Sequence, residues 1–375
     1  MIPFNKPFLI GTELKYIEEA VHSGKISGNG VFTKKCQQFF EQKYGFEKCL
    51  LTTSCTDALE MTAILADIKE GDEVIIPSYT FVSTALAFVR QGAKIVFADS
   101  YSDNPNIDAD TIEALVTPKT KVIVAVHYAG VACDMDKIME LSAKYNLLVI
   151  EDAAQAIDSF YIGKDGIKKA LGSIGHLAAF SFHETKNIIS GEGGMIVIND
   201  ERFIDRAEII WEKGTNRAQF FRGEINKYGW MDIGSSFLPS EVISAFLWAQ
   251  LENLDTIQKK RKQLWEYYYK QLSFIVEKLE IQMPQLPDYA TNNGHMFYIR
   301  FANLEERTKY IEKLKKQDVL SVFHYISLHS SPYYSSKHDG RVLPNSDKFT
   351  DTLLRLPMYY ELKEIEIDII VKCFK

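Results

Sequence analysis

The sequence contains few cysteines, and their arrangement suits neither a disulfide framework nor a metal site. The five cysteines are spread over 375 residues without a CxxC pair: Cys36, Cys49, Cys55, Cys133 and Cys373. An odd number of scattered cysteines is typical of reduced thiols in a cytoplasmic protein. We therefore expect free thiols and no metal centre.

The chain also lacks the long apolar runs that insertion into a membrane requires. No run approaches the roughly 18–20 residues that span a bilayer. Residues 1–10 show no basic region followed by an apolar core, so they do not resemble a secretion signal. We expect a protein of the cytoplasm with no membrane segment.

A surplus of positive charge is absent as well. The sequence has 43 basic and 50 acidic residues, which gives a net charge of −7. A protein that binds nucleic acid by its overall charge usually has a basic surplus, so the balance argues against that class. Any anionic substrate must then be bound by a local basic cluster.

The pattern of apolar segments changes near residue 200, and we see no internal repeat or low-complexity tract. Before that point, β-rich apolar runs alternate with helix-length segments at 56–67, 81–90 and 135–145. The seven strand candidates are residues 49–52, 73–76, 94–98, 122–126, 147–150, 178–182 and 195–198. This alternation predicts the α/β class, with a mainly parallel sheet covered by helices on both faces.

The second part of the chain is expected to form a smaller α+β unit. Helices are predicted at residues 202–212 and 240–270, the latter as one long helix or two joined ones. The elements expected after them lie at residues 281–300, 305–316, 319–325 and 362–373. We predict a large domain of residues 1–250 and a small C-terminal domain of residues 251–375.

Three chemically informative segments stand at the ends of predicted strands, where ligands of parallel sheets gather. The first, residues 52–56, is small and hydroxylic and precedes a helix. Free backbone N–H groups at a helix N-terminus, with hydroxyls beside them, form a phosphate site. The alternative interpretation is an ordinary helix cap.

The second segment, residues 149–155, ends an apolar strand with Glu151 and Asp152. A carboxylate at this position often only caps the next helix. The functional interpretation is that Asp152 pairs with the ring nitrogen of a pyridine cofactor, which needs a buried carboxylate to stay protonated and act as an electron sink.

The third segment, residues 180–186, carries Lys186 between an apolar strand and the glycine-rich turn 191–194. A lysine at any single position is most often a solvated surface residue. Desolvation at a sheet edge, however, lowers the pKa of a lysine and favours Schiff-base chemistry. The order of phosphate loop, acidic strand end and lysine strand end favours the second interpretation, in which Lys186 carries pyridoxal phosphate (PLP).

With these features the chain resembles the DegT/StrS-type sugar-nucleotide aminotransferases over nearly its whole length. The closest resemblance is to the subgroup that makes dTDP-4-amino-4,6-dideoxygalactose. The matching blocks are residues 2–5, 11–14, 32–33 with 36–38, 77–84, 127–133, 151–155, 180–187, 212–217, 219–223 and 323–325. The resemblance implies the PLP-dependent transferase fold type I, as in aspartate aminotransferase, and a homodimer with active sites at the subunit interface.

The resemblance also implies roles for individual residues. Lys186 would form the Schiff base and move the proton in catalysis, and Asp152 would pair with the ring nitrogen. Gln155 would lie near the ring hydroxyl, and Phe81 would stack on the ring. The residues that match phosphate-binding positions are Ser54, Cys55, Thr56 and Ser181. Many relatives add an asparagine from the partner subunit, but the corresponding position here is Leu238, so Ser235 or Ser236 is expected to substitute.

A local basic cluster fits a nucleotide-linked substrate. Residues 213–227 contain Lys213, Arg217, Arg222 and Lys227 against Glu224 alone, a local charge of +3. Because arginine can hold a phosphate with two hydrogen bonds, we expect Arg217 and Arg222 to contact the nucleotide. The alternative is a solvated loop. His183, Tyr325 and His329 are further candidates for substrate contacts, each with the alternative of a role in the core.

The implied reaction moves the amino group of L-glutamate to the C4 ketone of dTDP-4-keto-6-deoxyglucose through the pyridoxamine form of the cofactor. The expected product is dTDP-4-amino-4,6-dideoxygalactose for surface polysaccharide. A C3 aminotransferase acting on a dTDP-3-keto sugar, or a C4 enzyme with the gluco product, remains open. Lys186 argues against a 3-dehydratase, because those relatives carry histidine there.

Two other classes fit poorly. A nicotinamide-dependent oxidoreductase would need a glycine-rich turn after a strand, and Gly28-Asn29-Gly30 does not follow one. A regulator on this fold would need a DNA-binding extension, for which we expect no room in 375 residues.

Overall fold

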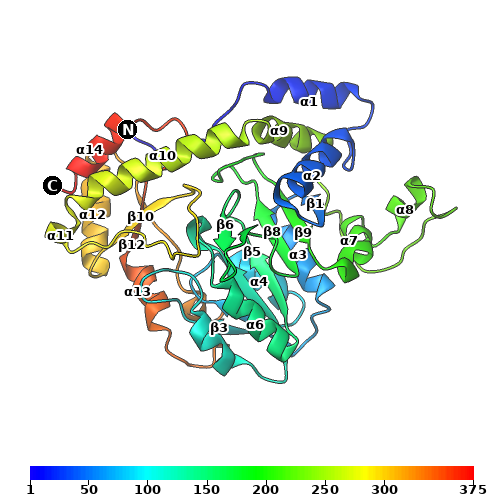
Figure 1. Ribbon diagram of the computed structural model, residues 1–375, viewed down its shortest axis with the longest axis horizontal. Coiled ribbons are helices and arrows are strands. Elements are labelled where there is room, and N and C mark those ends of the chain that lie inside the picture. Colours follow the sequence, from blue (N-terminus) through cyan, green and yellow to red (C-terminus); the bar gives the residue numbers. More distant parts are fainter.

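The protein is described by a computed structural model that covers residues 1–375, apart from the side chains of Glu277 and Lys278. A seven-stranded sheet of order β1-β9-β8-β5-β4-β2-β3 forms its centre (Figure 1). The strands are β1 Lys48–Thr52, β2 Glu73–Pro77, β3 Lys94–Ala98, β4 Thr120–Val126, β5 Leu148–Asp152, β8 Leu177–Ser181 and β9 Gly194–Ile198. Only β9 runs antiparallel to its neighbours. The α/β class and the mainly parallel sheet are therefore confirmed, and each expected strand lies within two residues of its predicted bounds.

Helices cover both faces of this sheet because its strands are apolar on both sides. One core joins alternate strand residues to α3 Cys55–Leu65, α4 Val82–Val89 and α7 Ile204–Trp211. The other core joins the remaining strand residues to a second layer of helices. That layer comprises α2 Val31–Tyr44, α5 Ala109–Ile112, α6 Met135–Tyr145 and α9 Glu241–Leu251.

The predicted 240–270 segment forms two helices, because α9 ends at Leu251 and α10 begins at Leu254 and runs to Ser273. Helix α10 packs Ile257 into a core of the large sheet and Leu264 into a third core. Helix α10 thus contributes to the cores of both parts of the chain. The predicted domain boundary at residue 250 stays a prediction.

The third core is built on a small sheet of order β10-β12-β11. Its strands are β10 Phe297–Arg300, β11 Val322–Phe323 and β12 Leu353–Leu356, and the helices α11 Val276–Leu279, α12 Leu304–Lys316 and α14 Glu364–Lys372 pack on them. Helix α13 Pro344–Thr352 instead packs Phe349 into a small cluster with Tyr79 and Tyr128. Ile2 also packs into this core, so both termini lie near α14 (Figure 1). Only the last four residues of the predicted 281–300 element are a strand.

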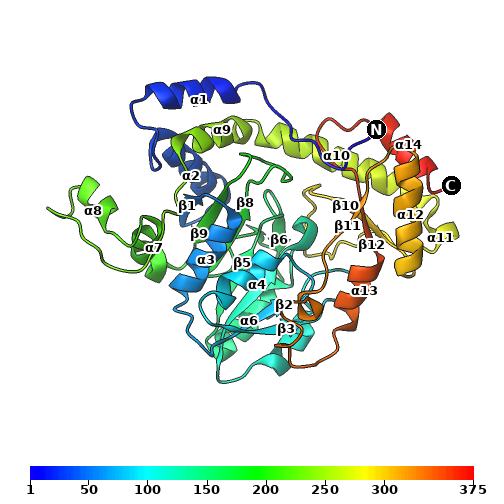
Figure 2. The ribbon, with the colours of Figure 1, turned by 180° about the vertical axis from the view of Figure 1, so that it is seen from behind.

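The remaining elements lie at the edges of the molecule. They are α1 Glu13–His22, the hairpin of β6 Phe160–Ile162 and β7 Lys168–Ala170, and 3₁₀ helices at Glu113–Leu115, Tyr128–Gly130, Glu201–Phe203 and Leu328–Ser330. Helix α8 Arg217–Phe221 lies in a segment that extends away from the body of the molecule (Figures 1 and 2). Among the described residues, no helix combines the length and the apolar character that crossing a membrane requires.

Candidate active site

A cavity of about 810 Å³ opens at the carboxyl ends of the parallel strands. Its first wall consists of strand ends and the segments that follow them: Ser54–Thr56 after β1, Thr80–Thr84 after β2, Asp152 on β5 and Ser181 on β8. Its second wall comes from the small sheet and its surroundings, and includes His295, Met296, His324, Tyr325 and Arg355. The cavity therefore lies where the strand order predicts a ligand site, and the C-terminal unit encloses it.

Lys186 lies on the turn between β8 and β9 and lines the cavity. Its backbone N–H donates to the carbonyl of His183 at 2.9 Å. The side-chain amide of the next residue, Asn187, donates to the side chain of Gln258 on α10 at 2.8 Å. These bonds hold the turn against α10. Burial lowers the pKa of the Lys186 ammonium, Cys55 and Asp152 oppose this shift, and the charge of Arg355 adds to it. The lysine is thus held in a site that favours its reactive free-base form.

Asp152 is the last residue of β5 and is 5% exposed. Its Oδ2 accepts a hydrogen bond from the Thr84 hydroxyl at 2.7 Å, and its Oδ1 accepts one from the backbone N–H of Ala154 at 3.2 Å. Burial raises the pKa of Asp152, while these two bonds and the charge of Lys186 work against that shift. The carboxylate is therefore fixed in orientation at the floor of the cavity.

The N-terminus of α3 forms a cradle of backbone N–H groups beside three hydroxyls. Ser54 caps the helix by accepting a hydrogen bond from the N–H of Asp57 at 3.1 Å, and the Thr56 hydroxyl lies 2.8 Å from that of Ser83. Any side chain at Gly194 on β9 would collide with the backbone of Ser54 and Cys55, so the cradle lies directly on the sheet. The N–H groups of Cys55 and Thr56, the first two residues of α3, have no acceptor within the helix and are available to an anionic ligand.

Phe81 and Gln155 line the cavity between the cradle and the second wall. Phe81 precedes α4 and is 55% exposed, so its ring is available to a planar ligand. The Gln155 side chain accepts from the N–H of Ala129 at 2.6 Å and donates to the Tyr325 hydroxyl at 3.0 Å. Tyr325 adopts a positive φ of 53°, a conformation that is costly for a bulky residue and places its ring in the site.

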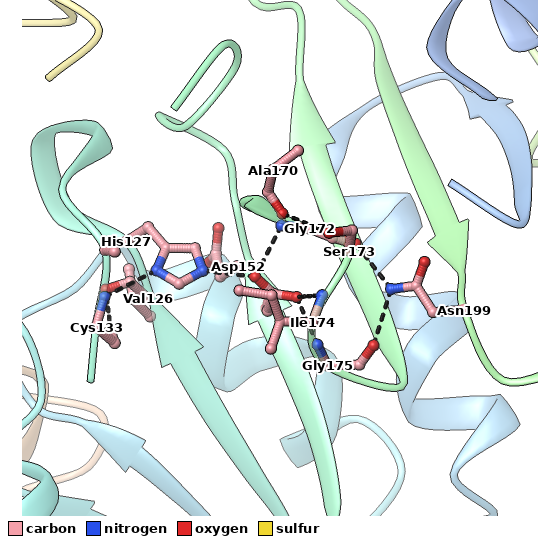
Figure 3. Close-up of polar contacts among 12 residues, drawn as sticks. Val126, His127, Cys133, Asp152, Ala170, Gly172, Ser173, Ile174, Gly175 and Asn199 are labelled. Atoms are coloured by element: carbon pink, nitrogen blue, oxygen red, sulfur yellow. Dashed lines mark hydrogen bonds and ion pairs between the residues drawn. The ribbon is translucent and has the colours of Figure 1, made fainter. Parts of the chain in front are cut away.

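His127 and Glu151 form a fully buried pair behind the cavity floor, 2.9 Å apart. Because Cys133 N–H donates to His127 Nδ1 at 3.2 Å, the ring proton lies on Nε2 and faces Glu151. Figure 3 shows His127 between Cys133 and the turn that carries Gly172 and Gly175. The Glu151 carboxylate accepts three N–H bonds from that turn, and this network ties β5 to β4 and to the turn before β8.

Ten of the thirteen predicted site residues line the cavity: Ser54, Cys55, Thr56, Phe81, Asp152, Gln155, Ser181, His183, Lys186 and Tyr325. His183 lies near Glu192, with 3.6 Å between His183 Nε2 and the carboxylate. His329 is buried outside the lining, where its Nδ1 is hydrogen-bonded to the Ser78 hydroxyl at 2.7 Å. Its proposed substrate contact is not formed within the single chain.

The two predicted phosphate-binding arginines also lie outside the cavity of their own chain. Arg217 contacts Glu212 at 3.3 Å and stacks on Phe221. Arg222 makes ion pairs with Glu208 at 2.7 Å and Glu224 at 2.6 Å. Their role in substrate binding stays a prediction that requires a second subunit.

The lining residues that were not among the candidates from the sequence include Thr84, His295, His324 and Arg355. His295 and His324 are buried, and burial holds the pKa of each imidazole well below its ordinary value. Arg355 could have been noticed as the single charge in the apolar run 353–358. The two histidines and Thr84 carry no local signal of this kind.

The chemistry of these groups fits pyridoxal phosphate. Its aldehyde requires an amine, which Lys186 offers, and its ring nitrogen requires a carboxylate, which Asp152 offers. Its phosphate requires N–H and hydroxyl donors, which the α3 cradle provides. Phe81 provides a flat apolar surface for the ring. A half-buried lysine whose pKa is lowered, a buried carboxylate and an anion cradle in one cavity fit the site of a PLP-dependent enzyme.

Comparison with known proteins agrees with this class. Residues 8–375 match the DegT/DnrJ/EryC1/StrS aminotransferase family. The spore coat polysaccharide biosynthesis protein SpsC of Bacillus subtilis is 30% identical over 388 aligned residues, which cover 100% of this chain and 96% of SpsC. The chain thus belongs to the DegT/DnrJ/EryC1/StrS family and is a PLP-dependent aminotransferase.

Solved structures support the same assignment. The aminotransferase from Psychrobacter cryohalolentis superposes with a TM-score of 0.91 at 26% identity, over 99% of this chain and 98% of that one. The PLP form of a Streptococcus pneumoniae protein described as a candidate sugar aminotransferase superposes with a TM-score of 0.89 at 25% identity, over 100% and 97% of the two chains. The predicted fold type and cofactor are therefore confirmed.

Proposed function

We propose that the protein moves the amino group of L-glutamate to the C4 ketone of dTDP-4-keto-6-deoxyglucose. The product would be dTDP-4-amino-4,6-dideoxygalactose, a building block of surface polysaccharide. The names of the relatives support the sugar: SpsC is named for polysaccharide biosynthesis, and the S. pneumoniae protein for a sugar aminotransferase. The cavity, at about 810 Å³, lies in the upper range of pockets that enclose whole small-molecule ligands.

The observation that carries the proposal is that Lys186 and Asp152 meet in one buried cavity with opposite pKa shifts. Burial lowers the pKa of the Lys186 ammonium, which favours its action as a base, whereas Thr84 orients Asp152, which would hold a proton on the ring nitrogen. When bound, PLP supplies the electron sink that stabilises negative charge on the substrate carbon. Lys186 would remove the proton from Cα of glutamate and return it on the carbon that becomes C4′ of pyridoxamine phosphate.

The same residues would then act in the reverse direction on the sugar ketone. Lys186 would move the proton back, and the amine would remain on the sugar. Because a single cavity serves both substrates in turn, we expect ping-pong kinetics. The enclosed second wall, with Tyr325 and His324, would keep water from the reacting atoms.

The extended segment around α8 supports the predicted homodimer. It exposes large apolar side chains, with Trp230 84% exposed, Phe221 68%, Met231 60% and Ile233 54%. Apolar side chains gathered on an extended segment favour association. In a dimer this segment would bring Arg217 and Arg222 toward the nucleotide in the partner's cavity, and Ser235 or Ser236 toward the cofactor phosphate. Sedimentation of the holoenzyme tests the dimer, and an Arg222→Ala variant with unchanged KM for the sugar nucleotide would remove that arginine from the proposal.

One assay tests the substrate directly. The purified holoenzyme is offered L-glutamate with dTDP-4-keto-6-deoxyglucose, and then with the 3-keto isomers, and the product is assigned by NMR. We expect an axial amine at C4. An amine at C3, or an equatorial amine at C4, would overturn the specific substrate or stereochemistry and leave the general reaction in place.

A further inference from the structure

The turn that carries Lys186 is tied to distant parts of the chain through the side chain of the next residue, Asn187. Its amide nitrogen donates to the Gln258 side chain on α10 at 2.8 Å and to the carbonyl of Asn293 at 3.0 Å. Its amide oxygen lies 2.8 Å from Nδ1 of His295. Asn187 and its three partners are all buried. Because Asn187 follows Lys186 directly in the chain, the bonds that orient Asn187 also orient the backbone of Lys186.

The hydrogen bond between His295 and Asn187 runs in one direction. Both amide hydrogens of Asn187 are donated elsewhere, to Gln258 and to Asn293, so its oxygen faces His295 and accepts. The proton of the neutral imidazole therefore lies on Nδ1. Burial holds the pKa of His295 well below its ordinary value, and the charge of Lys186 adds to that shift. The ring is thus a neutral donor to Asn187 at neutral pH.

The segment that carries His295 is itself fixed against α10. Arg261 on that helix donates to the carbonyl of Gly294 at 3.0 Å and to that of His295 at 2.7 Å. Gly294 has a positive φ of 62°, and any side chain there would collide with the backbone of Arg261. The backbone N–H of His295 donates to the Asn293 side chain at 2.9 Å. The imidazole therefore projects from a rigid support in the second wall, and it lines the same cavity as Lys186.

We propose that His295 is a positioning residue for Lys186, which it holds in place at the cavity through Asn187. The bond joins the second wall to a turn that lies 108 residues earlier in the chain, and it does so next to the amine that would react. A buried hydrogen bond is costly to leave half-made, and a small displacement of a reacting group lowers its rate steeply. This inference rests on the proposed function only in that Lys186 holds the cofactor; it does not depend on the donor or on the sugar.

Two substitutions separate the bond to Asn187 from the rest of the imidazole ring. His295→Leu removes the donor and keeps an apolar side chain, whereas His295→Asn can still donate to Asn187 from the position of Nδ1. Apoprotein is mixed with PLP, and formation of the visible Schiff-base absorbance is followed in time. We expect the rate constant to fall about 10- to 100-fold in His295→Leu, the scale for displacement of a reacting group. His295→Asn should recover most of this loss.

The reactivity of Lys186 in the apoprotein gives a readout that needs no cofactor. A short pulse of reductive methylation is applied between pH 6 and 11, and modification of Lys186 is measured by mass spectrometry. Burial lowers the pKa of Lys186, and a loosened turn would let water reach the amine. In His295→Leu we therefore expect the midpoint of labelling to rise by about one pH unit. In His295→Asn the midpoint should equal that of wild type.

Two further variants control for general effects on the fold. Asn187→Ala removes the same bond from its other end, so the double variant with His295→Leu should be no slower than the slower single one. Tyr268→Phe is the matched stability control, because it removes a buried hydrogen bond from α10 to the carbonyl of Pro357 at 2.9 Å. It should lower the melting temperature and leave both the rate of Schiff-base formation and the labelling midpoint unchanged.

Two outcomes would overturn the proposal. A His295→Leu protein that loses stability but keeps the wild-type rate and midpoint would make His295 a structural residue. Equal losses in His295→Asn and His295→Leu would assign the effect to Nε2 or to the shape of the ring. If His295→Leu does not fold, Asn187→Ala takes its place in both comparisons. Failure of the proposed function gives a different result: both readouts still respond to His295, while dTDP-4-keto-6-deoxyglucose is not aminated.

Discussion

Glu151 and Asp152 are consecutive residues of β5 whose carboxylates serve opposite faces of the central sheet. Glu151 lies in the core and accepts hydrogen bonds from His127 and from the turn before β8. Asp152 faces α4, accepts a hydrogen bond from Thr84 and lines the cavity. The alternation of side chains along a strand thus places a structural acid beside the acid that we propose to be catalytic.

The catalytic member of this pair should affect turnover without affecting folding. In Asp152→Asn the amide keeps the size of the side chain but cannot hold a proton on the ring nitrogen by charge. We expect kcat to fall on the order of 10²–10³-fold, as for other losses of a positioned electrostatic group. Steady-state kinetics and a melting curve of the apoprotein measure the two effects. A melting temperature that drops as far as in Glu151→Gln would contradict the division of roles.

The structural member should show the reverse pattern. Glu151→Gln would place an amide NH₂ against a set of N–H donors and leave part of the network of His127 unsatisfied. We expect the free energy of unfolding to fall by about 3 kcal/mol, the scale for breaking a buried charged network. Urea denaturation measures this. The protein that remains folded should have the wild-type kcat per molecule of bound cofactor. A loss of kcat without a loss of stability would argue against a purely structural role.

Lys186→Ala should lose the visible Schiff-base absorbance of the holoenzyme, because no amine remains to hold the cofactor covalently. Transamination should fall by at least about 10²–10⁴-fold, the usual contribution of a positioned base. Removal of a buried amine whose pKa is lowered by burial should not reduce the melting temperature of the apoprotein. Lys186→Arg, which retains a cation, is the control. A Lys186→Ala protein that kept the Schiff-base absorbance and its transamination activity would refute the assignment.

The two buried histidines of the second wall predict how stability depends on pH. Burial holds the folded-state pKa of His295 and His324 well below 6.5, whereas the unfolded chain titrates near that value. Below about pH 6.5 the unfolded chain therefore binds more protons than the folded one, and the free energy of unfolding decreases as the pH falls. The limiting slope is about 1.4 kcal/mol per pH unit for each histidine.

His295→Asn tests this, because asparagine can still donate to Asn187, the partner of His295 Nδ1 at 2.8 Å. Melting curves of apoprotein between pH 5 and 8 should show a smaller loss of stability in acid for the variant. Taking the difference between variant and wild type removes the opposite contribution of Asp152, whose pKa is raised. The lowered pKa of Glu151 acts below 4.5, outside this window. Parallel pH curves would mean that folding does not change the pKa of His295, and would contradict the prediction.

The sequence by itself determined the central sheet and the first wall of the site. The spacing of apolar residues predicts the strands. A residue that follows a parallel strand then lies at the carboxyl edge of the sheet, independently of how the distant parts of the chain pack. For that reason Lys186, Asp152 and the cradle at Ser54 could be predicted from local order. The break between α9 and α10 at residues 252–253 could not be predicted in this way. The residues on both sides favour a helix, so only tertiary packing decides where the helix is interrupted.

The tertiary structure alone decided the second wall and the separation of the two acids. Arg355, His324 and His295 reach the cavity from more than 100 residues beyond Lys186, through the way the small sheet folds back on the large one. No local pattern encodes such contacts, because their position depends on the packing of α10 into two cores at once. The sequence therefore predicted the lysine that we propose to bind the cofactor, and only the fold placed Arg355, His295 and His324 in the same cavity.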